Sequence, residues 1–220
     1  MSSAKRRRRR AVAVPRASVS EARPPRGLFL LLFALSGMSG LIYQVIWARQ
    51  LTLVFGATSP AITTVLVSFM LGLAVGSYAA GRWALRLGHP LRAYALIELG
   101  IAAYAVTFPF LLELLTLVHV PVFRLLVETP VALGAVRIFL AAAIMLPPTV
   151  LMGASLPVLT RALVPDGSSI GREVGMLYGL NTLGGAAGVY LGTFFLLPGV
   201  GLTGGLLSAA ALNGVVSGLA

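Results

Sequence analysis

The chain contains no cysteine, and only 6 of its 220 residues are acidic. The absence of cysteine excludes disulfides, thiolate metal sites and cysteine nucleophiles. Charged residues make up 10% of the chain, against about 25% in a typical soluble domain, and hydrophobic residues make up 58%. So few polar side chains cannot cover a surface that faces water. The composition therefore predicts a multi-pass membrane protein surrounded mostly by lipid.

Residues that carry chemistry are also scarce. The chain has two histidines, His89 and His119, and neither has acidic neighbours at the spacing of metal ligands. No serine–histidine pair supports an intramembrane protease, and no glycine-rich phosphate loop follows a strand, because no strand is predicted. We therefore expect no catalytic residue, no cofactor and no metal ion in this chain.

Six stretches are apolar and approach the roughly 20 residues that a helix needs to cross the hydrocarbon of a bilayer. Prolines lie in or beside the breaks between them, among them Pro90, Pro121, Pro130 and Pro198. The expected fold is an all-α bundle of six transmembrane helices over residues 27–220. The predicted spans are residues 27–47, 61–85, 93–115, 138–163, 174–197 and 202–220.

Residues 1–26 form a strongly basic tail, with six consecutive cationic residues from Lys5 to Arg10. We expect this tail to be disordered and cytoplasmic. We also expect it to contact anionic lipid and no nucleic acid, because no aromatic residue interleaves with the arginines. With the N-terminus inside, fourteen of the seventeen basic residues fall on the cytoplasmic side: nine in the tail, three beside the second loop and two beside the fourth. This bias predicts a protein of the cell's inner membrane with both termini in the cytoplasm.

Two of the predicted spans carry glycines at four-residue spacing, which is just over one helical turn. These are Gly72 and Gly76 in the second span, and Gly184, Gly188 and Gly192 in the fifth. Small residues on one face let two helices approach closely in lipid, so we interpret these glycines as helix-packing positions, although such a groove can also line a path between helices. The first and fourth spans both carry small-residue breaks. Together these similarities suggest a three-plus-three internal repeat, as in half of a major facilitator transporter.

The fourth span contains three prolines, Pro147, Pro148 and Pro157. Each proline removes a backbone donor and clashes with the preceding turn, so the sequence predicts a kinked helix that faces protein. Thr149 and Ser155 are candidates to bond the carbonyl groups that the prolines leave free.

Glu98 is the carboxylate predicted to lie deepest inside a span. A buried carboxylate is costly in lipid, so we expect Glu98 to face the bundle interior, either as a structural hydrogen-bonding group or as a site for a proton or a cationic ligand. Asn181 and Tyr178, three residues apart on one face of the fifth span, are its expected neighbours. Trp47 and Arg49 are expected at the outer membrane interface.

Five segments carry a family resemblance in a fixed order. They read SGMSGLIYQVIWARQLTLVFG (36–56), VLVSFMLGLAVGSYAAGR (65–82), ALIELG (95–100), PPTVLMGASLPVLTRAL (147–163) and GMLYGLNTLGGAAGVYLGTFFLLP (175–198). Together they resemble the membrane module of the fused major-facilitator/spermidine-synthase-like family. Two positions depart from that family's pattern: Gln44 stands where a glutamate is usual, and Leu85 where an aspartate is usual. The second departure argues against a fully coupled transporter.

The resemblance implies a half-major-facilitator bundle followed by a cytoplasmic polyamine aminopropyltransferase domain. No residue of that transferase active site is present in this chain, so we expect a membrane-only member, one part of a split gene, or a truncated sequence. The implied role is to tether an aminopropyltransferase or to handle a polyamine-like cation. Two alternatives remain open: a small transporter that assembles as a homodimer, and a structural membrane subunit without a ligand.

Overall fold

The computed structural model describes residues 25–57, 59–164 and 169–220, and in these ranges the regular structure is entirely helical. Most of the basic tail, including Lys5 to Arg10, lies outside the described residues. Within the described ranges, five helical stretches are long and apolar enough to cross a membrane, and the fifth of them is the whole of Ile170–Leu219. The expected all-α class is therefore confirmed. The elements are α1 (Arg26–Phe55), α2 (Ser59–Trp83) with a 3₁₀ turn (Ala84–Arg86), α3 (Pro90–Leu126), α4 (Pro130–Leu163), α5 (Ile170–Leu191), a π-helical segment (Gly192–Leu196) and α6 (Leu197–Leu219).

Several helices are longer than the sequence predicted. α1 ends at Phe55 instead of residue 47, because neither Trp47 nor Arg49 interrupts backbone hydrogen bonding; the break comes at Gly56, whose φ of 90° favours glycine. α3 runs on to Leu126, so the placement of Pro121 in a loop was wrong. α4 begins at Pro130, where proline is favoured as a first helical residue because its missing N–H needs no partner there.

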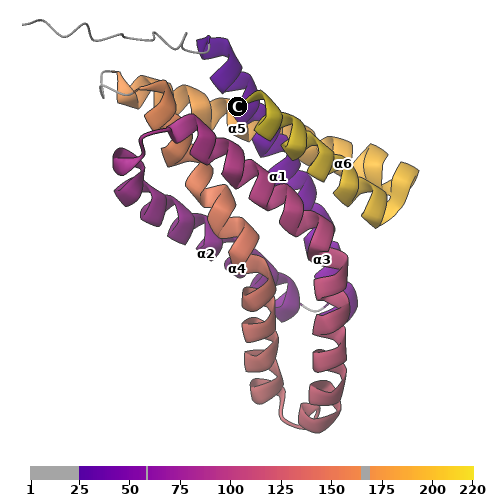
Figure 1. Ribbon diagram of the computed structural model, residues 1–220. Helices are drawn as coiled ribbons and strands as arrows, with labels where there is room; N and C mark the ends of the chain where they lie inside the picture. Colours follow the sequence, from indigo (N-terminus) through magenta and orange to yellow (C-terminus); the bar gives the residue numbers. More distant parts are fainter. Residues whose placement is uncertain (1–24, 58, 165–168) are drawn as a thin grey trace, which may run out of the picture.

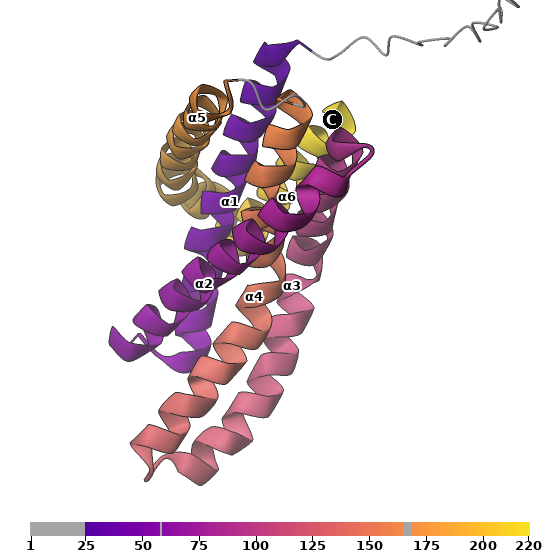
Figure 2. The same cartoon turned by 90° about the vertical axis from the view of Figure 1, so that its left-hand side faces the viewer.

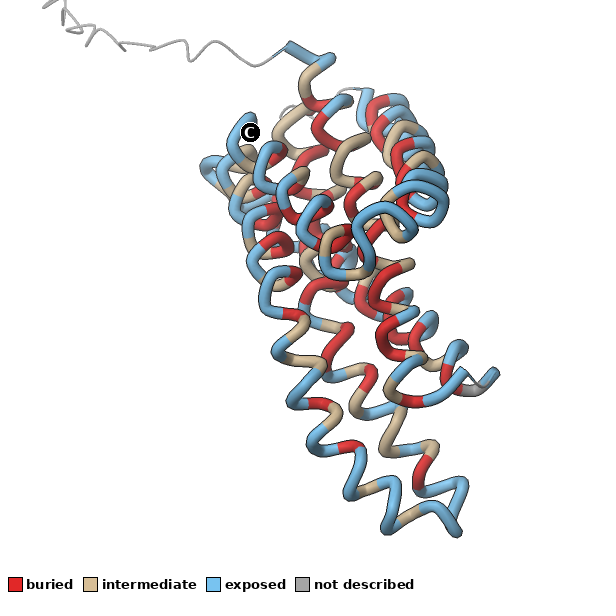
Figure 3. Tube along the Cα trace, turned by 90° about the vertical axis from the view of Figure 1, so that its right-hand side faces the viewer, coloured by how far each residue is buried: buried red, intermediate tan, exposed pale blue. Residues whose placement is uncertain are grey.

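The helices form one bundle in which α1 packs on α5 and α6, and α4 packs on α2 and α3. α3 also packs on α6, which joins the two groups. The hairpin of α3 and α4 extends well beyond the ends of the other helices (Figures 1 and 2). Buried residues follow the inner faces of the helices (Figure 3). Many of the exposed residues are large and apolar, as contact with lipid requires.

Glycines mark the crossing of α2 with α4. A Cβ atom added at Gly76 would overlap the backbone carbonyl of Val150, and one added at Gly72 would overlap the Thr149 side chain. At Gly76 the contact is between the two backbones and leaves no room for any side chain. The two helices can therefore approach this closely only because α2 has glycine here.

The crossing of α1 with α5 is built in the same way. A Cβ atom at Gly184 would overlap the carbonyl of Ala34, and one at Gly188 would overlap the carbonyl of Met38. Gly192 differs, since an added Cβ would lie at an ordinary 3.6 Å from the Ile42 side chain. Two of the three glycines in the α5 stripe therefore make backbone contact, and the third does not.

α4 remains helical through Pro147, Pro148 and Pro157 and changes direction along its length (Figure 1). A proline leaves the carbonyl four residues earlier without its helical donor, so Pro148 frees the carbonyl of Ile144 and Pro157 frees that of Gly153. Other helices supply the missing donors. The hydroxyl of Tyr104 on α3 donates to Ile144 at 2.6 Å, and the hydroxyl of Ser77 on α2 donates to Gly153 at 2.8 Å.

The expectation that Thr149 and Ser155 would bond these freed carbonyls was wrong. Thr149 donates to the carbonyl of Met145 at 2.7 Å, and Ser155 lies within hydrogen-bonding distance of the Leu151 carbonyl at 3.3 Å. Both bonds follow the usual back-bonding of helical serine and threonine to the preceding turn. This local geometry aims the hydroxyls away from the carbonyls that the prolines free.

Candidate functional site

Glu98, two turns into α3, is the centre of a polar network in the bundle interior and has no exposed surface. Its Oε1 accepts a hydrogen bond from the hydroxyl of Ser36 on α1 at 2.7 Å, and its Oε2 accepts one from Nδ2 of Asn213 on α6 at 2.7 Å. The hydroxyl of Ser155 on α4 lies 3.4 Å from Oε1. We call Glu98, Ser36, Ser155 and Asn213 the Glu98 network. It joins four helices around a single carboxyl group.

The partners of Glu98 are uncharged hydroxyl and amide groups, and both of its oxygens act as acceptors. Ion pairs between described residues form at another acid: Arg26 at the start of α1 lies 2.8 Å from Glu173 at the start of α5, and Arg172 lies 3.6 Å from it. A buried carboxylate bonded only to neutral donors is stabilised in position but not neutralised in charge. It is suited to receive a proton or a cation.

Tyr94 lies one turn before Glu98 on the same face of α3 and has no exposed surface. Its hydroxyl is 3.3 Å from the carbonyl of Leu32 on α1, and it also lies within range of the Glu98 carboxyl. Tyr94 thus closes the side of the network that faces the starts of α1 and α3.

On the other side of Glu98, aromatic rings fill the space between α1 and α3. Trp47 stacks between Tyr43 and Phe108, with ring centroids 5.0 Å apart in each pair, and Tyr104 meets it edge-on at 6.3 Å. Trp47 has no exposed surface, so the expectation that it anchors the chain at the membrane interface was wrong. The reason is the extra length of α1, which continues two turns past Trp47 and places it inside the bundle. Arg49, on the opposite face of α1, is exposed.

The structure does not bring the expected neighbours to Glu98. Asn181 on α5 donates from Nδ2 to the carbonyl of Phe33 at 3.0 Å, and Tyr178 is 64% exposed on the outside of the bundle. Asn181 therefore lies at the contact of α1 with α5, and Tyr178 lies on the outer face of α5. Asn213 bonds Glu98 in the place expected for Asn181. Asn181 and Asn213 are the chain's two asparagines. The sequence signal that could have identified Asn213 is an amide side chain within an apolar span.

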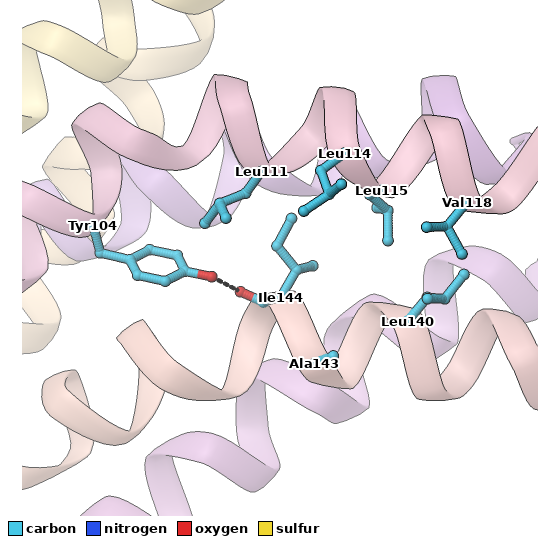
Figure 4. A pocket seen from close by; sticks show the side chains of 8 residues that line it. All are labelled: Tyr104, Leu111, Leu114, Leu115, Val118, Leu140, Ala143 and Ile144. Atoms are coloured by element: carbon cyan, nitrogen blue, oxygen red, sulfur yellow. Dashed lines mark hydrogen bonds between the residues drawn. The ribbon is translucent and has the colours of Figure 1, made fainter.

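An apolar groove of about 250 Å³ lies between α3 and α4, further along the hairpin (Figure 4). Tyr104 is the only polar side chain in its lining, and the Tyr104 hydroxyl is already bonded to the carbonyl of Ile144. The groove therefore offers no group that would orient a charged or polar ligand. Its lining consists of Tyr104, Leu111, Leu114, Leu115, Val118, Leu140, Ala143 and Ile144.

Within the described residues, no three histidine or acidic side chains come close enough together to hold a metal ion. Comparison with known proteins finds no matching family model, no similar curated protein and no similar solved structure. The Glu98 network is thus defined by its own geometry.

Proposed function

We propose that the chain is a six-span membrane module of the half-major-facilitator type, in which Ile170–Leu219 crosses the membrane twice. Gly201 has non-helical backbone angles within this stretch, with φ 71° and ψ −173°. The starts of α1 and α5 and the C-terminus lie at the same end of the bundle (Figures 1 and 2). A return of the chain to its starting side requires a second crossing. Such a return places the C-terminus on the side where α1 begins, and the excess of Lys and Arg predicted for that side supports its being the cytoplasmic face of an inner membrane.

The helix packing fits a three-plus-three repeat of inverted topology, and this pattern supports the proposal. Exchanging α1 with α4, α2 with α5 and α3 with α6 converts the packing of α1 on α5 into that of α4 on α2. The same exchange converts the packing of α3 on α4 into that of α6 on α1. Inverted repeats of this kind build the halves of many secondary transporters, with binding sites between the repeats.

The glycine contacts follow the same exchange. Gly37 of α1 packs against the carbonyl of Asn181, and Gly153 of α4 packs against the carbonyl of Leu73. The two glycines are 116 residues apart and the two carbonyls 108 apart. The same separations recur at a second pair of contacts, in which Gly184 packs against the carbonyl of Ala34 and Gly76 packs against the carbonyl of Val150. Here the two carbonyl residues are 116 apart and the two glycines 108 apart.

We further propose that Glu98 binds the amino group of a polyamine-like cation. The single observation that carries this proposal is a fully buried carboxyl group at the contact of α3 with α6, whose hydrogen-bonding partners among the described residues are all neutral. In the proposed repeat, this contact joins the two halves. An ammonium group offers three donors and the missing positive charge. The family resemblance of the sequence supports an amine as the ligand and supports a tethered aminopropyltransferase as its source or user.

The test is binding of spermidine to the purified protein in detergent, measured by isothermal titration for the parent and for Glu98→Gln. We expect the Gln variant to fold, because Asn213 can turn its Oδ1, which lacks a partner among the described residues, toward the new amide. We expect its affinity to fall by about 2 kcal/mol or more, the scale of a charge-assisted hydrogen bond. Glu113→Gln removes a carboxylate from the exposed face of α3 and is the matched control. Equal binding by all three proteins would contradict the proposal.

A purely structural role for Glu98 gives a different pattern. Glu98→Ala would then lower the stability of the bundle, and Glu98→Gln would leave both stability and amine binding at the parental level. The same three proteins and Glu98→Ala, compared by thermal unfolding and by titration, therefore separate a ligand site from a ligand-free structural subunit.

A further inference from the structure

The apolar groove between α3 and α4 is long and narrow, with Tyr104 at one end and Val118 at the other (Figure 4). These two residues are 14 positions apart on α3, which is roughly 21 Å along the helix. Leu114 and Val118 are 57% and 45% exposed, so the groove is reached from the outside of the bundle. A water molecule needs two to four polar contacts, and a lining with one polar side chain does not supply them. The groove therefore suits a hydrophobic occupant.

Arg137 on α4 lies just beyond the Val118 end of the groove. Its Nε donates to Nε2 of His119 at 3.4 Å, and its guanidinium group lies 5.8 Å from the centre of the Phe123 ring. Arg137 precedes Leu140 by three residues, so it continues the face of α4 that lines the groove. No described acid forms an ion pair with Arg137. A positive charge without a counter-ion among the described residues thus adjoins the mouth of the groove.

The depth of Arg137 in a membrane follows from the lengths of the helices. Along α4, Arg137 and Arg161 are 24 residues apart, which is at most roughly 36 Å in a helix that changes direction. A bilayer is about 30 Å thick across its hydrocarbon and about 40–45 Å thick with its headgroups. The ring of His119, which Arg137 contacts, lies 5.0 Å from the ring of Phe55, the last residue of α1. Arg137 is thus level with the end of α1, and it reaches the headgroups of one leaflet when Arg161 lies in those of the other.

We propose that the groove binds one acyl chain of a phospholipid whose phosphate pairs with Arg137. Arginine suits this role because its planar guanidinium group donates several hydrogen bonds to one phosphate. The groove runs from the level of the headgroups toward the middle of the bilayer. Its length of roughly 21 Å covers the about 15 Å of hydrocarbon that the chains of one leaflet span. This lipid would be a ligand separate from the proposed amine, because it contacts no residue of the Glu98 network.

Native mass spectrometry of the full chain in detergent, with dioleoyl phosphatidylglycerol as the probe, tests the proposal. We expect the parent to bind one lipid per chain with a Kd at least about tenfold lower than that of Ala143→Phe, whose ring occupies the groove. Ala103→Phe is the matched control, because Ala103 is exposed on α3 and is no part of the lining. Arg137→Gln should also weaken binding about tenfold. Arg124→Gln removes an exposed arginine near the same end of α3 and should leave binding unchanged.

Equal binding by the parent, Ala143→Phe and Ala103→Phe would overturn the proposal. A dimer of the parent that Ala143→Phe dissociates would also overturn it, because a second copy of the chain would then fill the groove. Dioleoylglycerol has the same chains and no phosphate, so it tests the phosphate contact even if Arg137→Gln fails to fold. We expect it to bind the parent at least about tenfold more weakly, and equal binding of the two lipids would contradict the role of Arg137. No amine is present and Glu98→Gln should bind the lipid as the parent does, so failure here is distinct from failure of the amine-binding proposal.

Discussion

Replacing Tyr104 with phenylalanine removes one hydroxyl from the contact between α3 and α4 and keeps the ring that packs on Trp47. The lost hydrogen bond is short, 2.6 Å, and its acceptor, the carbonyl of Ile144, has no helical donor because residue 148 is proline. Interhelical hydrogen bonds in membrane bundles average about 0.6 kcal/mol. A buried acceptor left without any partner costs more, about 1–3 kcal/mol. We therefore expect Tyr104→Phe to lower the free energy of unfolding by about 1–2 kcal/mol.

A double-mutant cycle tests the physical reason for this loss. Pro148→Ala restores a backbone N–H four residues after Ile144, so the helix itself can then bond that carbonyl. In the Pro148→Ala background, Tyr104→Phe should cost about 0.5 kcal/mol or less, which gives a coupling of about 1 kcal/mol between the two positions. The assay is reversible unfolding in mixed detergent, followed by circular dichroism.

Pro157→Ala provides the matched control for the cycle. It restores the donor for Gly153, whose carbonyl is bonded by Ser77, and leaves Ile144 as it is. Tyr104→Phe and Pro157→Ala should therefore be additive, whereas Ser77→Ala and Pro157→Ala should be coupled. Equal destabilisation by Tyr104→Phe in all three backgrounds would refute the idea that neighbouring helices replace the donors lost to proline.

Three further outcomes are expected. Gly188→Leu should prevent close contact of α5 with α1 and should cost about 1–3 kcal/mol of stability or abolish folding. Gly192→Leu is the control, because an added Cβ has ordinary space there, and it should accumulate nearly as the parent does in size-exclusion profiles. Equal loss of folded protein by both variants would place the contact elsewhere. Arg26→Ala should lower the free energy of unfolding by less than about 1 kcal/mol, and the effect should disappear at high salt, because Arg26 is 41% exposed in its pair with Glu173. A large, salt-independent loss of stability in thermal unfolding would contradict this prediction. Reporter fusions after Ala220 should read cytoplasmic if the chain crosses six times, and a periplasmic reading would leave five spans.

The sequence was sufficient to predict the helical class and the interior position of the Glu98 side chain, because one acid within an apolar span is visible without any structure. It was insufficient for the partners of Glu98. Ser36, Ser155 and Asn213 come from three other helices, and their meeting depends on how those helices cross. The same limit explains Asn181, whose position on α5 gave no indication that its amide would bond the backbone of α1.

The helix ends and the proline partners were missed for related reasons. Polar and aromatic residues such as Trp47 are typical of membrane interfaces, yet a helix continues through them until a residue such as Gly56 breaks it. The donors that bond the freed carbonyls of α4 come from α2 and α3 at long sequence separation. Local back-bonding of Thr149 and Ser155 follows from the sequence, whereas those interhelical bonds follow only from the packed structure.

An experimental structure at saturating concentration of a linear diamine, compared with a diamine-free structure, tests the proposed function of Glu98 most directly. We expect one amine nitrogen within hydrogen-bonding distance of a carboxyl oxygen of Glu98, with Asn213 Oδ1 as a second acceptor. The bonds from Ser36 and Asn213 that now satisfy the carboxyl should lengthen or reorganise to admit it. A diamine-saturated structure in which these bonds stay at 2.7 Å and no ligand adjoins Glu98 would contradict the account.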